Sequence, residues 1–157
     1  MNKKVLFKSE KHDYETPKDL FDKYHSEYHF KIDLAASKDN KKLDKYLGLD
    51  KGENALQLDW WPYKRCWLNP PYGRHVDDWI RKCHEEMYKG CLIVALLASR
   101  TDTIWFHKYV YNQPFIRYHF LKGRVKFVGM KDAAPFPSVV VIFDGESLTG
   151  GSEKKNT

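Results

Sequence analysis

Short runs of apolar residues, separated by stretches rich in Lys, Asp, Gly and Pro, recur along the chain and predict buried strands. These runs are residues 30–36, 55–60, 67–68, 92–97, 115–121, 125–128 and 139–143. The last two runs are joined by a segment rich in Ala and Pro. We therefore expect the sheet to end in an antiparallel hairpin at its C-terminal side.

Helices are predicted between these strands. Apolar residues at helical spacing predict an amphipathic helix over residues 76–88. Its apolar face comprises Val76, Trp79, Ile80, Cys83 and Met87. Thr16 and Pro17 are typical of a helix start, with Thr16 as the N-cap and Pro17 at the first helical position. A further helix, capped by Thr101 or Asp102, is predicted to carry Ile104, Trp105, Tyr109 and Val110.

The alternation of strands and helices predicts an α/β fold, with a mostly parallel sheet covered by helices on both faces. The length of 157 residues fits a single compact domain, which we expect to span residues 14–145. Residues 1–13 are polar and charged and are predicted to form a flexible N-terminus. Residues 146–157 are rich in Gly, Ser and Lys and are predicted to be a disordered tail.

Polar residues close three of the predicted strands. Asp33, Asp59 and Asn69 each stand at a predicted strand end. Ligands of open α/β sheets bind beyond the carboxyl ends of the strands. We therefore expect these three side chains to share one rim of the sheet and to line a ligand site there.

Composition narrows the range of partners. The net charge is +6 and aromatic residues make up 15% of the chain, which suits nucleic acid, since cations meet phosphates and rings meet bases. The three cysteines fit no paired metal-ligand spacing, so we expect no metal. Without a recognisable signal peptide, we expect a cytoplasmic location. The longest apolar run, residues 91–98, is too short to span a membrane.

The four residues Asn69-Pro70-Pro71-Tyr72 carry the clearest chemistry. The two prolines fix φ and remove two backbone donors, and Pro70 favours an extended conformation at Asn69. The result is a stiff elbow that presents an amide oxygen, a free carbonyl and an aromatic ring. The Asn69 side-chain oxygen and the Pro70 carbonyl can accept the two N–H bonds of an adenine N6 amine, while Tyr72 can stack on the base.

Further blocks accompany this elbow, in a fixed order along the chain. They are Tyr14-Glu15-Thr16-Pro17, Asp33-Leu34-Ala35-Ala36 with Asn40 and Tyr46, Leu58-Asp59-Trp60, Trp67 to Tyr72, Arg100-Thr101-Asp102-Thr103 with Trp105-Phe106, Lys122 to Phe127, and Ala134 to Ser138. With these blocks the chain resembles the phage-type, Dam-like DNA N6-adenine methyltransferases of phages and prophages. The resemblance covers residues 14–143, nearly the whole chain.

The resemblance implies a Rossmann-like methyltransferase fold with S-adenosylmethionine as methyl donor. The positions that it implies for cofactor binding are Thr16, Pro17, Asp33, Leu34, Ala35, Asp59 and Trp60. Among them, Thr16 and Pro17 would lie at the methionine end, Asp33 and Ala35 at the exit of the first strand, and Asp59 at the cofactor adenine. One feature departs from the broad methyltransferase pattern. No glycine-rich loop follows Asp33, because the next glycine is Gly48, so the backbone cannot approach the cofactor in the usual way.

The implied reaction is direct methyl transfer to an adenine that is flipped out of double-stranded DNA. Tyr72 would stack on one face of this base, and Phe127 or Phe136 could close the other. The cations expected to contact phosphates or bases are Arg74, Arg100, Lys122, Arg124 and Lys126. The last three alternate in a predicted strand, so they could share one face.

Two other classes of function remain open at this point. The same elbow could methylate RNA adenine or a protein glutamine, and the chain could be a non-catalytic DNA-binding module on a methyltransferase fold. An intact elbow argues against the second. The recognised DNA sequence and the oligomeric state are left open, and recognition is expected from the loops 37–54, 73–78 and 129–136.

Overall fold

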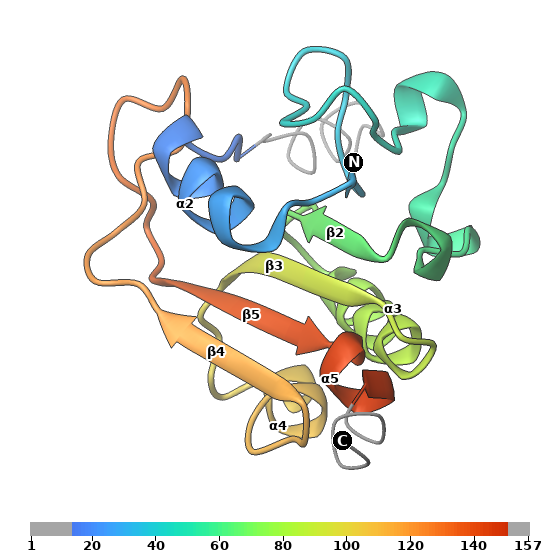
Figure 1. The fold of residues 1–157 in the computed structure, drawn as a ribbon. Coiled ribbons are helices and arrows are strands. Elements are labelled where there is room, and N and C mark those ends of the chain that lie inside the picture. The colour runs from blue at the N-terminus through green and yellow to red at the C-terminus, as the bar shows by residue number, and fades with distance from the viewer. Residues whose placement is uncertain (1–13, 151–157) are drawn as a thin grey trace.

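A five-stranded sheet in the order β1-β2-β3-β5-β4 forms the centre of the protein (Figure 1). The computed structural model describes residues 14–150, so the predicted flexible segment 1–13 lies outside the described residues. The strands are β1 (Ile32–Asp33), β2 (Arg65–Leu68), β3 (Leu92–Ala98), β4 (Ile116–Phe120) and β5 (Ser138–Asp144). β1, β2 and β3 are parallel, and β5 is antiparallel to both of its neighbours. The α/β class is thus confirmed, with a mixed sheet.

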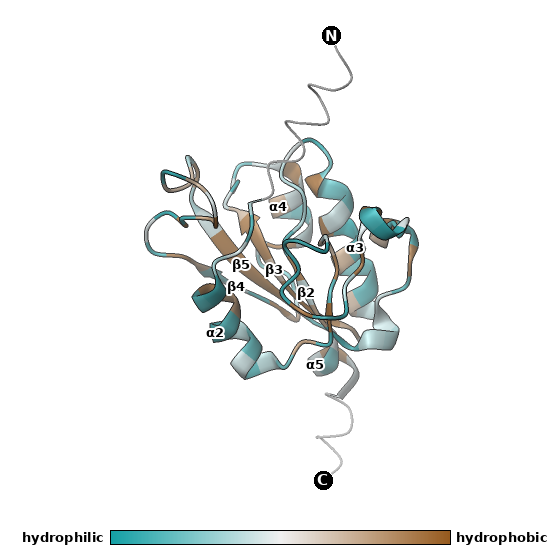
Figure 2. Ribbon diagram, turned by 90° about the horizontal axis from the view of Figure 1, so that it is seen from above, coloured by the Kyte–Doolittle hydropathy of each residue, from teal (hydrophilic) through white to brown (hydrophobic). Residues whose placement is uncertain are grey.

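Helices cover both faces of this sheet (Figure 1). They are α2 (Lys18–Tyr28), α3 (Val76–Tyr88), α4 (Ile104–Tyr109) and α5 (Gly145–Gly150). Because successive strand residues point to opposite faces, β3 contributes to two cores. Ile93 and Leu97 belong to the core with α3 and α4, whereas Val94 and Leu96 belong to the core with α2. In Figure 2 the apolar strands accordingly lie inside a more polar outer layer of helices.

The strongest sequence patterns gave the most accurate elements. The helix predicted over residues 76–88 is α3, with Trp79, Ile80, Cys83 and Met87 buried. The runs 92–97 and 139–143 form β3 and β5, and every residue of both strands is buried. No helix within residues 14–150 is long and apolar enough to cross a membrane.

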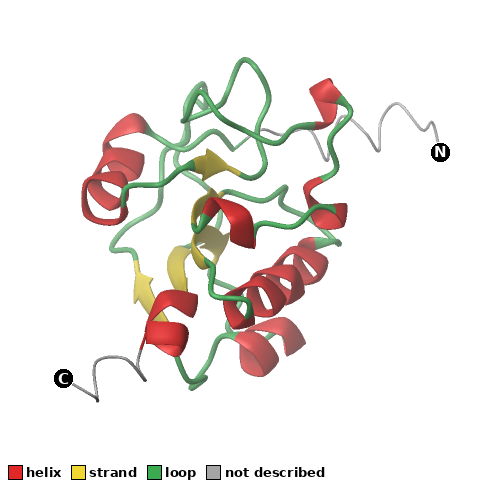
Figure 3. Cartoon of the chain, turned by 45° about the vertical axis from the view of Figure 1, so that its right-hand side comes forward, coloured by secondary structure: helices red, strands yellow, loops and turns green. Residues whose placement is uncertain are grey.

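The connection from β1 to β2 differs from the prediction. The expected strand over residues 55–60 is wrong, since this connection carries short 3-10 helices at Leu49–Lys51, Ala55–Gln57 and Trp61–Tyr63 (Figure 3). The Asn54 side chain accepts a hydrogen bond from the Leu56 N–H at 3.1 Å. Such local bonds satisfy the backbone without a strand partner. The first strand is also shorter than the predicted 30–36.

The C-terminal antiparallel hairpin is present, but with a different first strand. β4, not the predicted strand over 125–128, pairs with β5, and Ile116 lies opposite Phe143. Residues 121–137 form a long loop between them. Gly123 and Gly129 adopt φ of 75° and 79°, which interrupts an extended conformation on both sides of the predicted strand. Lys122, Arg124 and Lys126 therefore do not alternate along a strand.

The C-terminal end of the described chain is a helix, so the predicted tail from residue 146 is wrong as far as residue 150. α5 is anchored by the Gly145 N–H, which donates to the Cys91 carbonyl at 3.0 Å. Arg65 makes two further hydrogen bonds to the Glu146 carboxylate, at 2.7 and 3.0 Å. Residues 151–157 lie outside the described residues.

Two predicted helix caps are also wrong. The N-cap of α2 is Pro17, which makes no side-chain cap, and Thr16 stands one residue further out. The N-cap of α4 is Thr103, whose hydroxyl accepts from the Phe106 N–H at 3.3 Å, rather than Thr101 or Asp102.

Candidate active site

The carboxyl ends of β1, β2 and β3 meet at one edge of the sheet, because these strands are parallel. Asp33 ends β1, Asn69 follows β2, and Arg100 follows β3 after one intervening residue. The arrowheads of β2 and β4 in Figure 1 point toward this edge and toward the loop 121–137. Asp33 and Asn69 therefore share a rim, as the sequence predicted.

Asp59 does not share that rim. It lies in the connection before β2, its side chain is 65% exposed, and it forms an ion pair with Lys89 at 3.4 Å. Lys89 stands just before β3, so this pair marks the amino end of the strands. The predicted position of Asp59 at a strand end is wrong.

Trp60 is likewise remote from the elbow. Its side chain is fully buried, and its indole N–H donates to the Ala55 carbonyl at 2.8 Å. The indole also stacks on Trp79 of α3, with ring centroids 6.2 Å apart. Trp60 is thus a core residue on the α3 side of the sheet, and its side chain is closed to a ligand.

The Asn69 amide is held in one orientation. Its Nδ2 group donates to the Tyr14 carbonyl at 2.5 Å and to the Thr16 hydroxyl at 3.1 Å. A backbone carbonyl can only accept, so the NH₂ group must be the one that faces Tyr14. Oδ1 is consequently turned away from both groups, and it is buried with no hydrogen-bond partner among the described residues. The elbow therefore carries a fixed acceptor that is free for a ligand donor.

Four aromatic rings pack beside this amide. Tyr72 lies edge-on to Tyr14, with centroids 4.9 Å apart, and stacks on Phe136 at 5.2 Å. Phe127 lies 6.0 Å from Tyr72 and completes the cluster. Burial, with a smaller effect of Tyr14, raises the pKa of Tyr72 well above its ordinary value, so the phenol stays protonated. The predicted stacking ring thus already has ring partners of its own.

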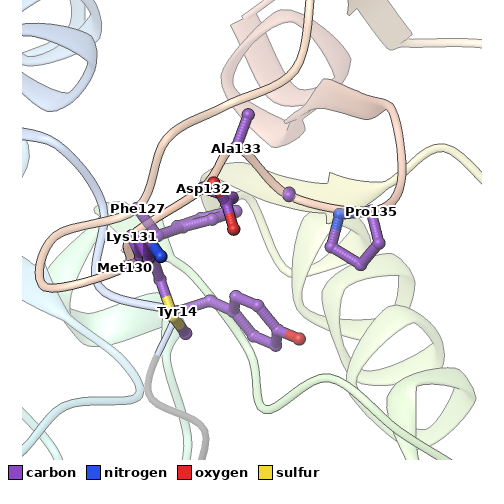
Figure 4. A pocket seen from close by; sticks show the side chains of 8 residues that line it. Tyr14, Phe127, Met130, Lys131, Asp132, Ala133 and Pro135 are labelled. Carbon is purple, nitrogen blue, oxygen red and sulfur yellow. The ribbon is translucent and has the colours of Figure 1, made fainter.

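Two grooves flank the cluster, and Tyr14 lines both. The smaller groove, about 310 Å³, lies between Tyr14, Phe127 and the segment 130–135 (Figure 4). The larger groove, about 1070 Å³, runs between the elbow, the start of α3 and α4. Its lining includes Tyr72 and the cations Arg74, Arg81, Arg100 and Lys108. Asp77 and Asp102 also line it, so the cations outnumber the acids by four to two. An aromatic surface with such an excess of cations suits a nucleic acid strand.

Comparison with known proteins identifies the family. A family model described as DNA N-6-adenine-methyltransferase (Dam) matches residues 3–145. The chain belongs to the Dam family. A protein of Haemophilus phage HP1, named DNA N-6-adenine-methyltransferase, is 27% identical over 159 residues, which covers 96% of this chain and 88% of that protein.

Membership of the Dam family confirms the resemblance that the sequence carried. The chain is an enzyme that methylates adenine N6 in DNA. The alternatives of RNA adenine, protein glutamine and a non-catalytic module are thereby set aside. The family also implies a methyl donor.

In this Dam family member, Asp33 is a buried carboxylate. Its side chain accepts from the backbone N–H of Lys42 at 3.0 Å and from that of Ala35 at 3.4 Å. Burial raises its pKa to about 6, although both backbone hydrogen bonds act in the opposite direction. Ala35 and Pro17 are half-buried, whereas the Leu34 side chain is fully buried in the core. A ligand could meet Leu34 only through its backbone.

The expected DNA contacts divide into two groups. Arg74 and Arg100 line the larger groove beside Tyr72. Lys122, Arg124 and Lys126 are exposed on the loop 121–137. Within residues 14–150, no cluster of three His, Cys, Asp or Glu side chains could hold a metal ion.

Arg81 and Lys108 also line the larger groove, and the sequence reading missed both. No pattern in the sequence marks either cation as facing this groove.

Proposed function

We propose that the chain transfers a methyl group from S-adenosylmethionine to N6 of an adenine flipped out of duplex DNA, with Asn69 and Pro70 as acceptors for the target amine. One observation carries this proposal. The Oδ1 atom of Asn69 is buried and has no hydrogen-bond partner within residues 14–150, while the NH₂ group beside it is fixed. Buried acceptors without a donor are rare and cost about 1–3 kcal/mol. An exocyclic amine supplies the missing donor.

The residues of the elbow act on the nitrogen by position and electrostatics. The adenine N6 lone pair is delocalised into the ring, so the amine is a weak nucleophile. Hydrogen bonds from N6 to Asn69 Oδ1 and the Pro70 carbonyl favour a more tetrahedral nitrogen and aim its lone pair. S-adenosylmethionine, when bound, supplies a methyl group on a positively charged sulfur. The proton that the amine loses passes to water, and no enzyme-bound covalent intermediate forms.

The cofactor end of the site is proposed at the exit of β1, with Pro17, Asp33, the Leu34 backbone and Ala35. Each Asp33 oxygen has one backbone donor, which leaves a lone pair for a further donor. A carboxylate at this position suits the ammonium group or the sulfonium of the donor. Ala35 stands where many dinucleotide-type sites have glycine, so its Cβ limits how closely the backbone can approach. These contacts favour a Rossmann-like methyltransferase fold, built here on a short sheet.

Base flipping requires the aromatic cluster to open. A base between two rings needs about 7 Å from ring to ring, twice the stacking distance of about 3.4 Å. Tyr72 and Phe136 are 5.2 Å apart. Phe136 lies on the loop 121–137, so movement of this loop would admit the base. Flipping costs a few kcal/mol, and stacking on Tyr72 would return about 1–3 kcal/mol.

Phosphate contacts are proposed along the larger groove. Arg74 and Arg100 flank the elbow there. The Arg100 guanidinium also lies 5.9 Å above the Phe136 ring, which links a cation to the aromatic cluster. Lys122, Arg124 and Lys126 would add contacts from the neighbouring loop.

The proposal is tested with Asn69→Ala. Purified protein, S-adenosylmethionine and duplex DNA should yield N6-methyladenine by mass spectrometry of digested DNA, and Asn69→Ala should reduce the product to background. Asn54→Ala serves as the control, since it also removes one asparagine with a local hydrogen bond, but in the β1–β2 connection. Full activity of Asn69→Ala would refute the proposed role of the elbow, and a label on cytosine would refute the reaction.

A further inference from the structure

The Thr16 hydroxyl contacts the Asn69 amide rather than the end of a helix. Thr16 is only 1% exposed, and its Oγ1 accepts from Asn69 Nδ2 at 3.1 Å. The adjacent helix α2 is capped by Pro17 without any side-chain hydrogen bond. A buried hydroxyl is therefore directed at the amide of the elbow, 53 positions away along the chain.

We propose that Thr16 is a positioning residue for methyl transfer, which holds the Asn69 amide so that Oδ1 faces the target amine. This inference rests on the role proposed above for Asn69. It assigns to Thr16 a function in the chemical step that differs from cofactor binding and from helix capping.

The Thr16 hydroxyl can matter because, beside the Tyr14 carbonyl, it is the second acceptor for the Asn69 NH₂ group. The terminal torsion of asparagine is soft and roughly two-fold, so an unrestrained amide can exchange its oxygen and nitrogen. Here the nitrogen side faces two acceptors, Tyr14 O and Thr16 Oγ1. A flipped amide would place Oδ1 against the Tyr14 carbonyl, which can offer no proton. Donation from both N–H bonds also polarises the amide and strengthens Oδ1 as an acceptor.

The segment that carries these two acceptors is itself fixed. The Glu15 carbonyl accepts from the Val128 N–H at 3.0 Å, which joins the segment to the loop 121–137. The Tyr14 ring packs edge-on against Tyr72 and Phe127, at 4.9 and 5.1 Å. The amide is therefore held by a packed element rather than by a mobile side chain.

The test compares Thr16→Val with Thr16→Ser. Valine keeps the shape of threonine and removes the acceptor, whereas serine keeps the hydroxyl. Under single-turnover conditions, with saturating S-adenosylmethionine and duplex DNA, Thr16→Val should transfer methyl about tenfold or more slowly than the native protein. Thr16→Ser should stay within about twofold, since the hydrogen bond is retained. The dissociation constant for S-adenosylmethionine, measured by calorimetry, should be unchanged in both.

Two outcomes of the kinetic test would overturn the inference. A normal transfer rate in Thr16→Val would show that the hydroxyl has no role in the step. A normal saturated rate with at least tenfold weaker cofactor binding would make Thr16 a cofactor residue instead. Either result would leave the role of Asn69 intact, because that role is decided separately by Asn69→Ala.

A second measurement covers the case in which Thr16→Val does not fold. The side-chain NH₂ signals of Asn69 can be observed by NMR in the native protein without DNA or cofactor, and assigned with Asn69→Ala. Because the NH₂ group donates two hydrogen bonds, its signals should be shifted downfield and their exchange with solvent slowed. Thr16→Ser should preserve both features. Random-coil signals from Asn69 in the native protein would refute the inference.

Discussion

At the scale of one residue, the burial of Asp33 makes the stability of the fold depend on pH. Its side chain is only 3% exposed, and burial raises its pKa from 3.8 to about 6. The folded protein therefore holds this proton more tightly than the unfolded chain does. The stabilisation from this group is fully present below about pH 4 and is lost as the pH rises through 6.

The first prediction concerns the decrease in stability as the pH rises. Between about pH 4 and pH 6, Asp33 should lower the free energy of unfolding by up to about 3 kcal/mol, since one pKa unit corresponds to about 1.4 kcal/mol. Asp33→Asn should remove this dependence, whatever constant offset it adds. Urea unfolding at several pH values measures the difference between the two proteins. Asp39→Asn, an exposed aspartate of the same connection, controls for removal of charge. A difference that does not vary with pH would contradict the prediction.

A second prediction concerns the cofactor. At pH 8 Asp33 is ionised and can attract the positive groups of S-adenosylmethionine, so Asp33→Ala should weaken binding at least tenfold, or by about 1.4 kcal/mol. Calorimetry measures this directly. Asp59→Ala removes a carboxylate from the opposite edge of the sheet and should leave the affinity unchanged. If Asp59→Ala weakened binding and Asp33→Ala did not, the proposed cofactor position would be wrong.

From the sequence, residues could be grouped into one site where they stand in consecutive positions. Asn69 to Tyr72 form one short elbow, so their joint chemistry could be inferred without a structure. The partnership of Thr16 with Asn69 depends on a contact between distant segments, and Thr16 followed by Pro17 resembles an ordinary helix start. Asp59 was misplaced for a similar reason, since a polar residue after apolar ones resembles a strand end.

At the scale of elements, the close approach of α5 to the end of α3 requires a glycine. A Cβ at position 145 would lie 2.3 Å from the Cys91 carbonyl oxygen and 2.4 Å from that of Met87. Both are backbone atoms, so neither can rotate away. At position 150, at the other end of α5, a Cβ would meet no atom of the described residues within 4 Å.

The third prediction is therefore that Gly145→Ala destabilises the protein by about 1–3 kcal/mol, the usual cost of overpacking, or by more. Gly150→Ala, in the same helix, should change the free energy of unfolding by less than about 0.5 kcal/mol. Thermal and urea unfolding of the two variants provide the comparison. Equal stability of both would mean that α5 is not packed against the end of α3 as described.

Elements could be predicted from the sequence where burial alone decides them. α3 has one apolar face, while β3 and β5 are apolar on both, so periodicity and length suffice. The segments 55–60 and 125–128 contain enough apolar residues to resemble strands. Local hydrogen bonds in the first and left-handed glycines beside the second decide otherwise, and neither feature contributes to a hydrophobic pattern.

At the scale of the whole molecule, the sheet order depends on contacts that are distant in sequence. β5 inserts between β3 and β4, and Leu92 pairs with Asp144 across the chain. This insertion brings the loop 121–137, which carries Lys122 and Arg124, to the same edge as the elbow. The composition predicted a basic partner surface, and its proposed position at this edge depends on the folded topology.

The fourth prediction tests that location through the salt dependence of DNA binding. Each phosphate contact releases counterions, so the logarithm of the binding constant should fall with the logarithm of salt concentration by about 0.9 per contact. Arg74→Gln with Arg100→Gln should make this slope shallower by about two, if both side chains contact phosphate.

The control pair, Lys31→Gln with Lys64→Gln, removes the same charge at the amino ends of β1 and β2. Because both pairs lower the net charge of +6 equally, only position can distinguish them. Titrations from low to moderate salt should leave the slope of the control pair near the native value. Equal slopes in the two double variants would mean that the DNA lies elsewhere, and Lys122→Gln with Arg124→Gln would then be the next pair to measure.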